Sequence, residues 1–403
     1  MEQTEVRIRA AKDDLAGAVS WVARNLPARP TQPILRGMIF LADDNGLQLA
    51  GYDYEVSTQI RISAEVDEPG RFAVNGKLVS DIVSKLPNKQ VEMHFDGTKV
   101  IVRCGSSRFE LPSLTLEDYP QLPEAPAATG TVDAALLAEA IGQVAVAAGK
   151  DESLPMLTGI RMETEGNEVT LAATDRFRLA VRSFEWEQVP EGETKLLIPA
   201  KTFAETARTL DTTSSEPVTL AFGDGSDDRE VGSEGLLAIL ADPRRTTTRL
   251  LDAEFPKFRP LLPKQHSSMA VARVDQLQDA IRRVSLMADH GAQIRMDFSD
   301  GQVVLSAHGD EVGHAEETVT CNFYGEPLLI AFNPQYLLEG LSAVRSHRVL
   351  LGFTQPSRPA ILIPEPEAIP ELGEDGFYPT PETDFTYPVS YTHLRAHETD
   401  SYL

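Results

Sequence analysis

A short stretch around Asp310 holds four side chains that could bind a metal ion. His308, Asp310, Glu311 and His314 supply imidazole and carboxylate groups, which are common ligands of zinc. A metal-dependent hydrolase is therefore one hypothesis for this chain. The stretch also falls where two expected strands turn, so a solvated hairpin accounts for the same residues. We favour the hairpin and expect neither a metal nor a cofactor.

Other patterns that would indicate catalysis fail on their spacing. The acidic segment GDGSDDREVGSE (223–234) has the residue types of a calcium loop but lacks the EF-hand spacing, so we expect an acidic hairpin insertion. The sequence has no GxxxxGK(S/T) phosphate loop, no GxSxG elbow and no HExxH motif. Cys104 has no paired histidine nearby and is typical of a strand residue. These observations predict a protein that is not an enzyme.

The composition indicates a cytoplasmic protein of several domains. At 403 residues the chain is long enough for two to four domains, and its 42% of hydrophobic residues allow packed cores. Only Cys104 and Cys321 are present, which indicates a reducing compartment and argues against a disulfide framework. No run of about 18 apolar residues could span a membrane, and the N-terminus lacks the apolar segment of a secretory signal.

A charged interruption in an apolar stretch is a candidate binding surface. In LAATDRFRLAVRS (171–183), the residues Asp175, Arg176, Phe177 and Arg178 separate two apolar segments that have the composition of strands. The interruption is either a polar corner between two strands or a surface that a partner binds.

Comparison of the sequence with itself reveals a threefold repeat. Asp53 in the first copy matches Asp175 in the second, and further along each copy Lys77, Lys201 and Gln335 align. Because the offsets between copies are nearly equal, the chain is best described as three copies of one unit of roughly 130 residues. The predicted domains are 1–127, 128–264 and 265–387.

Each copy is expected to contain two helices and about eight short antiparallel strands. In the first helix, Leu15, Val19 and Val22 recur at helical spacing and form one apolar face. The rest of each copy alternates with a period of two residues between turn signals, which is typical of antiparallel strands. The predicted fold class is α+β. The segments expected to be helical are 11–26, 76–87, 133–150, 200–211, 273–289 and 334–348.

The net charge of −24 argues against nucleic-acid binding when it is summed over the whole chain. The six expected helices, however, together carry about +1, so the strands and loops carry about −25. A chain with an acidic exterior and a relatively positive helical face could still meet DNA. The alternative is that the acidic loops serve only to keep the protein soluble.

The repeat and its motifs resemble the beta sliding clamp of the bacterial replicative DNA polymerase. The match covers residues 1 to about 387, with the motifs in the order and spacing of the family. The resemblance implies three DNA-clamp domains per chain, two chains in a closed ring, twelve helices lining the hole and sheets outside. It also implies no catalysis, because such a ring tethers proteins to duplex DNA. The motifs are RPTQPIL (29–35), LAATDRFRLAV (171–181), FPKFRPLLP (255–263) and FNPQYLLEGL (332–341).

The size of the repeat favours a ring of two chains over a ring of one. A domain of about 130 residues behaves as a sphere roughly 36 Å across, so six in a ring leave a hole of about 36 Å. Three would leave only about 6 Å, whereas duplex DNA is about 20 Å thick. We therefore expect a homodimer that encircles DNA and meets the clamp loader, the polymerase and other replication and repair proteins. The alternative is a repeat-built interaction scaffold that never encircles DNA.

Candidate DNA contacts follow from the resemblance and from charge. Arg29, in the proline-rich loop LPARPTQP, matches the arginine with which the family contacts DNA in the hole. Basic residues on the expected helices, or at their ends, are further candidates for non-specific phosphate contacts, with plain surface charge as the alternative. These candidates are Lys77, Lys150, Lys201, Arg282 and Arg283.

The resemblance also implies a pocket between the second and third domains for short peptides with a glutamine and hydrophobic anchors. Its apolar members would form a floor, and Arg178 and Tyr336 would supply polar rims. From the residues alone, Leu179 and Leu261 would instead be core residues and Arg178 a solvated strand end. The matching positions are Leu157, Thr174, Arg176, Arg178, Leu179, Pro256, Leu261, Asn333 and Tyr336.

The C-terminus departs from the pattern of the family. DFTY (384–387) fits the last strand of the family, but PVSYTHLRAHETDSYL (388–403) lacks the apolar strand, the Met-Pro pair and the final Arg-Leu that follow it there. This tail is atypical, as a fusion or a reading artefact would make it. We expect no apolar strand in the tail, an altered wall of the peptide pocket and a weakened third domain.

Overall fold

The computed structural model describes residues 5–188, 193–222, 235–289, 292–309, 313–354 and 358–393. The chain divides into two compact units. The first unit comprises Met1–Ala134, Glu187–Pro190 and Leu210–Leu250, and the second comprises Ala135–Trp186, Glu191–Thr209 and Leu251–Leu403. The division passes through the second repeat, so the domain boundaries at 127/128 and 264/265 stay a prediction. In the described part of the chain, no helix is both long and apolar enough to cross a membrane.

The strands of the first unit form two antiparallel sheets. The five-stranded sheet has the order β5 (Glu65–Glu68), β1 (Val6–Ala10), β7 (Val91–Phe95), β8 (Lys99–Cys104), β9 (Ser107–Pro112). The nine-stranded sheet has the order β14 (Glu187–Gln188), β10 (Gly130–Val132), β16 (Val218–Ala221), β17 (Leu236–Ala241), β18 (Arg244–Arg249), β4 (Val56–Ile62), β3 (Gly46–Tyr52), β2 (Gly37–Asp43), β6 (Gly70–Asn75).

The second unit is built on a thirteen-stranded antiparallel sheet. Its first half has the order β15 (Glu193–Pro199), β11 (Gly159–Glu165), β12 (Glu168–Thr174), β13 (Leu179–Glu185), β28 (Phe385–Val389), β26 (Ala360–Pro364), β25 (Arg348–Phe353). The sheet continues with β20 (Ser268–Arg273), β23 (Gly313–Tyr324), β22 (Gln302–Gly309), β21 (Ile294–Ser299), β24 (Leu328–Phe332) and β29 (Tyr391–His393). A separate two-stranded ladder joins β19 (Gln265–His266) to β27 (Tyr378–Pro379).

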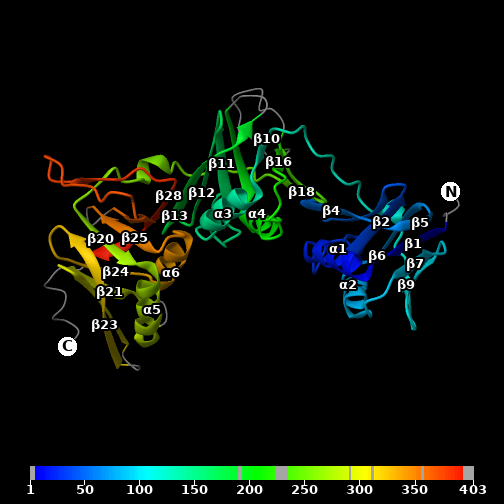
Figure 1. Ribbon diagram of the computed structural model, residues 1–403, viewed down its shortest axis with the longest axis horizontal. Helices are drawn as coiled ribbons and strands as arrows, with labels where there is room; N and C mark the ends of the chain where they lie inside the picture. The colour runs from blue at the N-terminus through cyan, green and yellow to red at the C-terminus, as the bar shows by residue number, and fades with distance from the viewer. Residues whose placement is uncertain are drawn as a thin grey trace. The chain divides into compact units, whose positions relative to one another are not determined.

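Each repeat contributes two α-helices, as the sequence predicts. Figure 1 shows α1 beside α2 in the first repeat and α5 beside α6 in the third. The helices are α1 (Lys12–Arg24), α2 (Gly76–Lys85), α3 (Ala134–Ala145), α4 (Ala200–Ala207), α5 (Val274–Val284) and α6 (Pro334–Ala343). Short 3₁₀ turns are η1 (Pro33–Arg36), η2 (Leu116–Asp118), η3 (Pro155–Leu157), η4 (Arg259–Leu261) and η5 (Ser285–Met287).

Local chemistry explains where the helices begin and end. The backbone N–H of Leu78 donates to Asn75 Oδ1 at 3.0 Å, and Asn333 Oδ1 accepts from the N–H of Gln335 at 2.9 Å, so an asparagine caps α2 and another caps α6. The helices are shorter than predicted at their C-termini. In α6 the reason is Arg345, whose φ of 53° is left-handed and cannot continue a helix.

The repeats are joined by the same strand pairing at both junctions. The last strand of the second repeat, β18, pairs with β4 of the first, with Thr246 opposite Thr58. Near the end of the third repeat, β28 pairs with β13 of the second, with Thr386 opposite Val181. In each case a strand near the end of one repeat pairs with the fourth strand of the preceding repeat, so the junction is a property of the repeat.

Apolar side chains fill the space between the helices and the sheets of the first repeat. Leu15, Val19 and Val22 of α1 are fully buried in one cluster with Phe40 and Phe72, whose rings stack at 5.0 Å. The predicted apolar face of the first helix is therefore its packing face.

Candidate partner and DNA interfaces

The charged interruption at Asp175 is a strand corner that occurs twice. Asp175 Oδ1 accepts hydrogen bonds from the N–H groups of Phe177 and Arg178, both at 3.0 Å. In the first repeat, Asp53 Oδ1 makes the matching pair of bonds, to the N–H groups of residues 55 and 56. The residue after the aspartate is left-handed in both copies, with φ of 81° at Arg176 and 74° at Tyr54. The corner is thus architecture.

Arg178 is a buried connector. Its side chain is 6% exposed, its Nε donates to Asp175 Oδ2 at 3.0 Å, and its Nη1 is ion-paired with Glu339 of α6. The guanidinium also lies 4.4 Å from the centre of the Tyr336 ring. Burial by itself would lower the pKa of Arg178, but Tyr387 and Glu339 beside it raise that pKa overall. The side chain is therefore a fixed cation that holds the corner against α6 and β28.

The exposed part of the corner is aromatic. The side chain of Phe177 is 53% exposed and stacks on Tyr336 with ring centres 6.1 Å apart. Arg176 beside it is exposed. Asn333, which caps α6, sets the position of Tyr336 one turn later. Phe177 was not among the predicted site residues, although its aromatic ring within a charged segment was the available signal.

The other predicted pocket residues divide into buried and exposed groups. Leu157, Thr174 and Leu179 are buried, whereas Pro256 is exposed and Leu261 is 46% exposed. Leu179 packs in one apolar cluster with Phe255 and Phe258, the neighbours of Pro256, so this segment lies against β13. Leu157 ends η3, and its carbonyl accepts from the N–H of Gly149.

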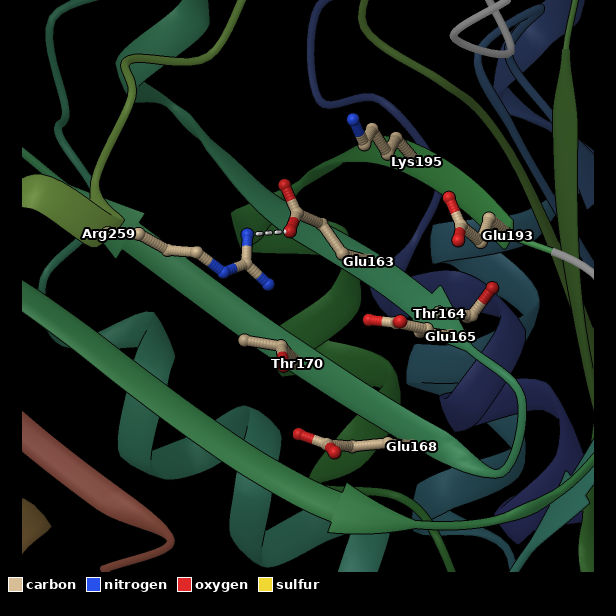
Figure 2. A pocket seen from close by; sticks show the side chains of 8 residues that line it. All are labelled: Glu163, Thr164, Glu165, Glu168, Thr170, Glu193, Lys195 and Arg259. Atoms are coloured by element: carbon tan, nitrogen blue, oxygen red, sulfur yellow. Dashed lines mark hydrogen bonds and ion pairs between the residues drawn. The ribbon is translucent and has the colours of Figure 1, made fainter. Parts of the chain in front are cut away.

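An ion pair anchors the turn that carries Leu261. Arg259, in η4, reaches Glu163 of β11, which also accepts from Arg161 Nε at 3.3 Å (Figure 2). The pair lines a polar hollow of about 250 Å³ on this sheet. Figure 2 shows Glu165, Glu168 and Glu193 around it as well. The ion pair thus fixes η4, which carries Leu261, to the face of the sheet of the second repeat that bears these acidic side chains.

The C-terminal tail corrects one prediction. No apolar strand was expected after residue 387, but β28 runs to Val389, which is fully buried and pairs with Ala360. Arg178 forms a bridge with Val389, and the N–H of Ser390 donates to the carbonyl of Phe177 at 2.8 Å. A further short strand, β29, pairs with β24. Backbone hydrogen bonds do not depend on the side chain, so a strand forms here although the apolar pattern of the family is absent. Residues 394–403 lie outside the described residues.

The predicted DNA contacts are all exposed. Arg29 lies in the loop between α1 and η1, and the lysines at 77 and 201 lie in the first turns of α2 and α4. Lys150 follows α3. Arg282 and Arg283 lie in the last turn of α5 and are ion-paired, Arg282 with Asp279 at 3.0 Å and Arg283 with Glu317 at 2.7 Å. These two arginines would have to exchange an acidic partner for a phosphate.

The residues that could bind a metal make a poor case for one. His308 and His314 face each other across the β22–β23 hairpin, as the hairpin interpretation predicts, while Asp310, Glu311 and the segment 223–234 lie outside the described residues. In the first unit, Glu5, Glu68 and His94 bring ligand atoms within 4.8 Å of one another. Arg7 lies opposite both Glu68 and His94 in the ladder, so a guanidinium already occupies that face of the sheet.

The cysteines have the environment of structural residues. Cys104 is buried in β8, and its thiol donates to the carbonyl of Pro87. Cys321 is buried in β23, and burial raises the pKa of its thiol to about 11. A thiol with a raised pKa is a poor nucleophile at neutral pH.

Comparison with known proteins identifies the family. Three family models match in order: the N-terminal domain of the DNA polymerase III beta subunit at residues 6–123, the central domain at 131–257 and the C-terminal domain at 259–369. The beta sliding clamp of Streptomyces coelicolor is 44% identical over 92% of this chain and 96% of that protein. The beta sliding clamp of Micrococcus luteus is 41% identical over 78% of this chain and 99% of its own length.

A solved structure shows the same fold. The DNA polymerase sliding clamp of Bacillus subtilis has a TM-score of 0.84 at 25% identity, and the alignment covers 97% of this chain and all of that one. The α+β fold of three clamp repeats is therefore confirmed. The chain belongs to the beta sliding clamp family, the non-catalytic processivity subunits of DNA polymerase III.

Proposed function

We propose that two copies of this chain close head to tail into a ring around duplex DNA, and that the ring holds the polymerase and other replication and repair proteins on it. Family membership supports this proposal, with each chain supplying three domains (1–127, 128–264 and 265–387). A clamp loader would open and close the ring, and the cytoplasm would be its compartment. The ring would bind any DNA sequence, because a sliding contact cannot depend on bases.

The observation that carries the proposal is a pair of strands that the junctions leave unused. At the two junctions within the chain, a strand near the end of one repeat, β18 or β28, pairs with the fourth strand of another, β4 or β13. The last strand of the first repeat, β9, is the edge of its sheet. Among the described residues, the part of β23 from Gly313 to Val319 pairs only with β22, because its pairing with β20 covers Cys321 to Tyr324. A second chain could use both free edges to form the same junction.

Exposed apolar side chains accompany both free edges. Phe109 is exposed on β9, and Leu286 is 76% exposed in η5, which contacts β23. Exposed Arg108 on β9 and exposed Glu316 on β23 add opposite charges to the two edges. An apolar residue with this exposure beside an unpaired strand is what a subunit interface buries.

The DNA contacts proposed are Arg29, Lys77, Lys150, Lys201, Arg282 and Arg283, all of them exposed. The partner site proposed is the corner of the second repeat, with Arg176, Phe177 and Leu261 as its exposed members. Arg178 and Tyr336 would set the shape of that site from below. A peptide with a glutamine and hydrophobic anchors would bind there.

Two measurements test the ring. The solution mass should be twice 44.1 kDa, and Phe109→Asp should give single chains, because a charge at the edge prevents pairing. Clamps loaded onto a nicked circular duplex should stay bound through gel filtration and should leave when the circle is linearised. A single-chain mass for the wild type, or release that does not depend on DNA ends, would refute the proposal.

The alternative is a repeat-built interaction scaffold that does not encircle DNA. The strongly acidic strands and loops favour it, since a negative surface repels DNA. Under this alternative the chain still binds the peptide, but circular and linear DNA are retained equally poorly.

A further inference from the structure

An arginine of the second repeat lies against the first helix of the chain. Arg244 begins β18 and pairs with Ile60 of β4, a core residue beneath α1, so its side chain is on the face of the sheet that α1 covers. Its guanidinium carbon lies 5.7 Å from the centre of the Trp21 ring in α1. The guanidinium is thus held in place by a buried aromatic ring.

A second arginine approaches from the helix. Arg24 is in the last turn of α1, three residues after Trp21, and is therefore on the same side of the helix. Its side chain is exposed and has no ion pair or hydrogen bond among the residues that the structure describes. Burial lowers the pKa of Arg244, and repulsion by Arg24 lowers it further, while Asp211 opposes that shift. The two guanidinium groups are therefore near enough to repel each other.

Two groups of the described chain oppose this repulsion. Asp211 is one acidic group near Arg244, and its Oδ1 also accepts from the N–H of Thr213 at 2.9 Å and from the hydroxyl of Thr213 at 2.7 Å. The C-terminal carbonyls of α1 supply a weak negative potential near Arg24. An anion between the two guanidinium groups would remove the repulsion and would accept hydrogen bonds from both.

We propose that Arg24 and Arg244 together bind one backbone phosphate of the duplex at the junction of the first and second repeats. The inference rests on the proposed ring, and it adds a site outside the set of helical lysines and arginines named above. The chain has a net charge of −24, yet two arginines from different elements converge on its helix-bearing face. This local positive charge fits a polyanion as its partner. A phosphate suits planar guanidinium groups, which bind it through paired N–H donors.

The test compares charge-matched variants in DNA binding. Arg24→Gln with Arg244→Gln removes the pair. The control, Arg71→Gln with Arg245→Gln, removes two exposed arginines from the opposite face of the same sheet, since Arg245 follows Arg244 in the strand and Arg71 pairs with Leu41 beside Phe40. Arg24→Lys with Arg244→Lys keeps the charge. Binding of an open-ended duplex is measured by fluorescence anisotropy between 0.05 and about 0.3 M salt.

Each chain of the proposed ring would lose one phosphate contact, so the glutamine pair removes one or two contacts per ring. The slope of log affinity against log salt should fall by about 1 to 2, and binding should weaken roughly 10-fold or more at about 0.1 M salt. The control should change the slope by much less, and the lysine pair should restore most of it. All variants should keep the solution mass and the thermal midpoint of the wild type.

Equal slopes for the glutamine pair and its control would overturn the inference, while retention of the wild type on circular DNA would still support the ring. Loss of a partner protein with an unchanged DNA slope would assign the pair to a carboxylate surface instead and also overturn it. A wild type that is not retained on circles refutes the ring itself, and the two failures are thereby distinguished.

Discussion

His266 should make the second unit less stable in acid. Its side chain is fully buried between β19 and the strands beneath, and Gly352 packs so closely that a Cβ there would lie 2.6 Å from Nδ1. Thr380 Oγ1 donates its hydrogen to the carbonyl of Pro263 and lies 2.8 Å from His266 Nε2. The neutral imidazole therefore carries its hydrogen on Nε2 and donates a hydrogen bond to the Thr380 hydroxyl oxygen. Nδ1 has no hydrogen-bond partner in the described chain. A second proton would therefore sit on a buried nitrogen that has no acceptor.

The size of the effect follows from the pKa. Burial lowers the pKa of His266 from 6.5 to about 4. Between these values the unfolded chain binds a proton that the folded chain does not, so stability falls as the pH falls through this window. The group should cost about 2 kcal/mol at pH 5 relative to pH 7, and about 3 kcal/mol once the pH is below 4.

The assay isolates this residue from the other titrating groups. His266→Gln removes the titration and keeps an amide that can donate to Thr380, and His347→Gln removes an exposed histidine as the control. Trp186 lies in the second unit and Trp21 in the first, so a Trp21→Phe background makes fluorescence report the second unit alone. Urea unfolding at pH 7 and pH 5 gives the free energy of unfolding for each variant.

The wild type and His347→Gln should lose about 2 kcal/mol more than His266→Gln between pH 7 and pH 5. If all three lose the same free energy, His266 does not titrate as a buried, unpaired imidazole and the reasoning is wrong. A larger loss in His266→Gln would have the wrong sign and would equally refute it.

Three further results are expected. Light scattering should show that Phe109→Asp converts the proposed dimer to single chains, whereas Leu372→Asp, at an exposed leucine between β26 and β27, should not do so. Leu261→Asp should weaken the binding of a glutamine-containing hydrophobic peptide about tenfold or more, as measured by calorimetry, because burying one apolar side chain contributes roughly 1.5–3 kcal/mol. Unchanged affinity would show that Leu261 is not part of the site. Arg178→Ala should cost about 3 kcal/mol of unfolding free energy, because it leaves the carboxylates of Asp175 and Glu339 without their cation, and a cost as small as that of the exposed Arg176→Ala would contradict this.

The fold was predictable because its signals repeat along the chain. Apolar spacing such as that of Leu15, Val19 and Val22 marks a helix face, and Asp53 and Asp175 mark the same corner in two copies. The helix ends were less predictable, because they depend on single conformations such as the left-handed backbone of Arg345. The strand at Val389 was missed, because backbone pairing with the neighbouring strands forms it without the expected apolar pattern.

The candidate site was predictable in its location but not in its internal contacts. The Arg-Phe-Arg-Leu that follows Asp175 distinguishes this corner from the one at Asp53, and that difference is visible in the sequence. The pairing of Arg178 with Glu339, and of Arg259 with Glu163, joins residues about a hundred or more positions apart. Long-range ion pairs of this kind leave no local pattern, so a sequence assigns Arg178 to an open rim as readily as to a buried connector.

The repeated junction gives the chain a direction. The first repeat offers its last strand, β9, and the third repeat offers β23, the counterpart of β4 and β13. Neither free edge would form this junction with a second copy of itself. Two chains joined in this way must therefore meet at two equivalent but polar seams. A chain blocked at β9 and a chain blocked at β23 can still form one seam when mixed, although each alone can form none. The mixture would be an open arc with a single defined gap, which is the geometry that a clamp loader would have to create in the proposed ring.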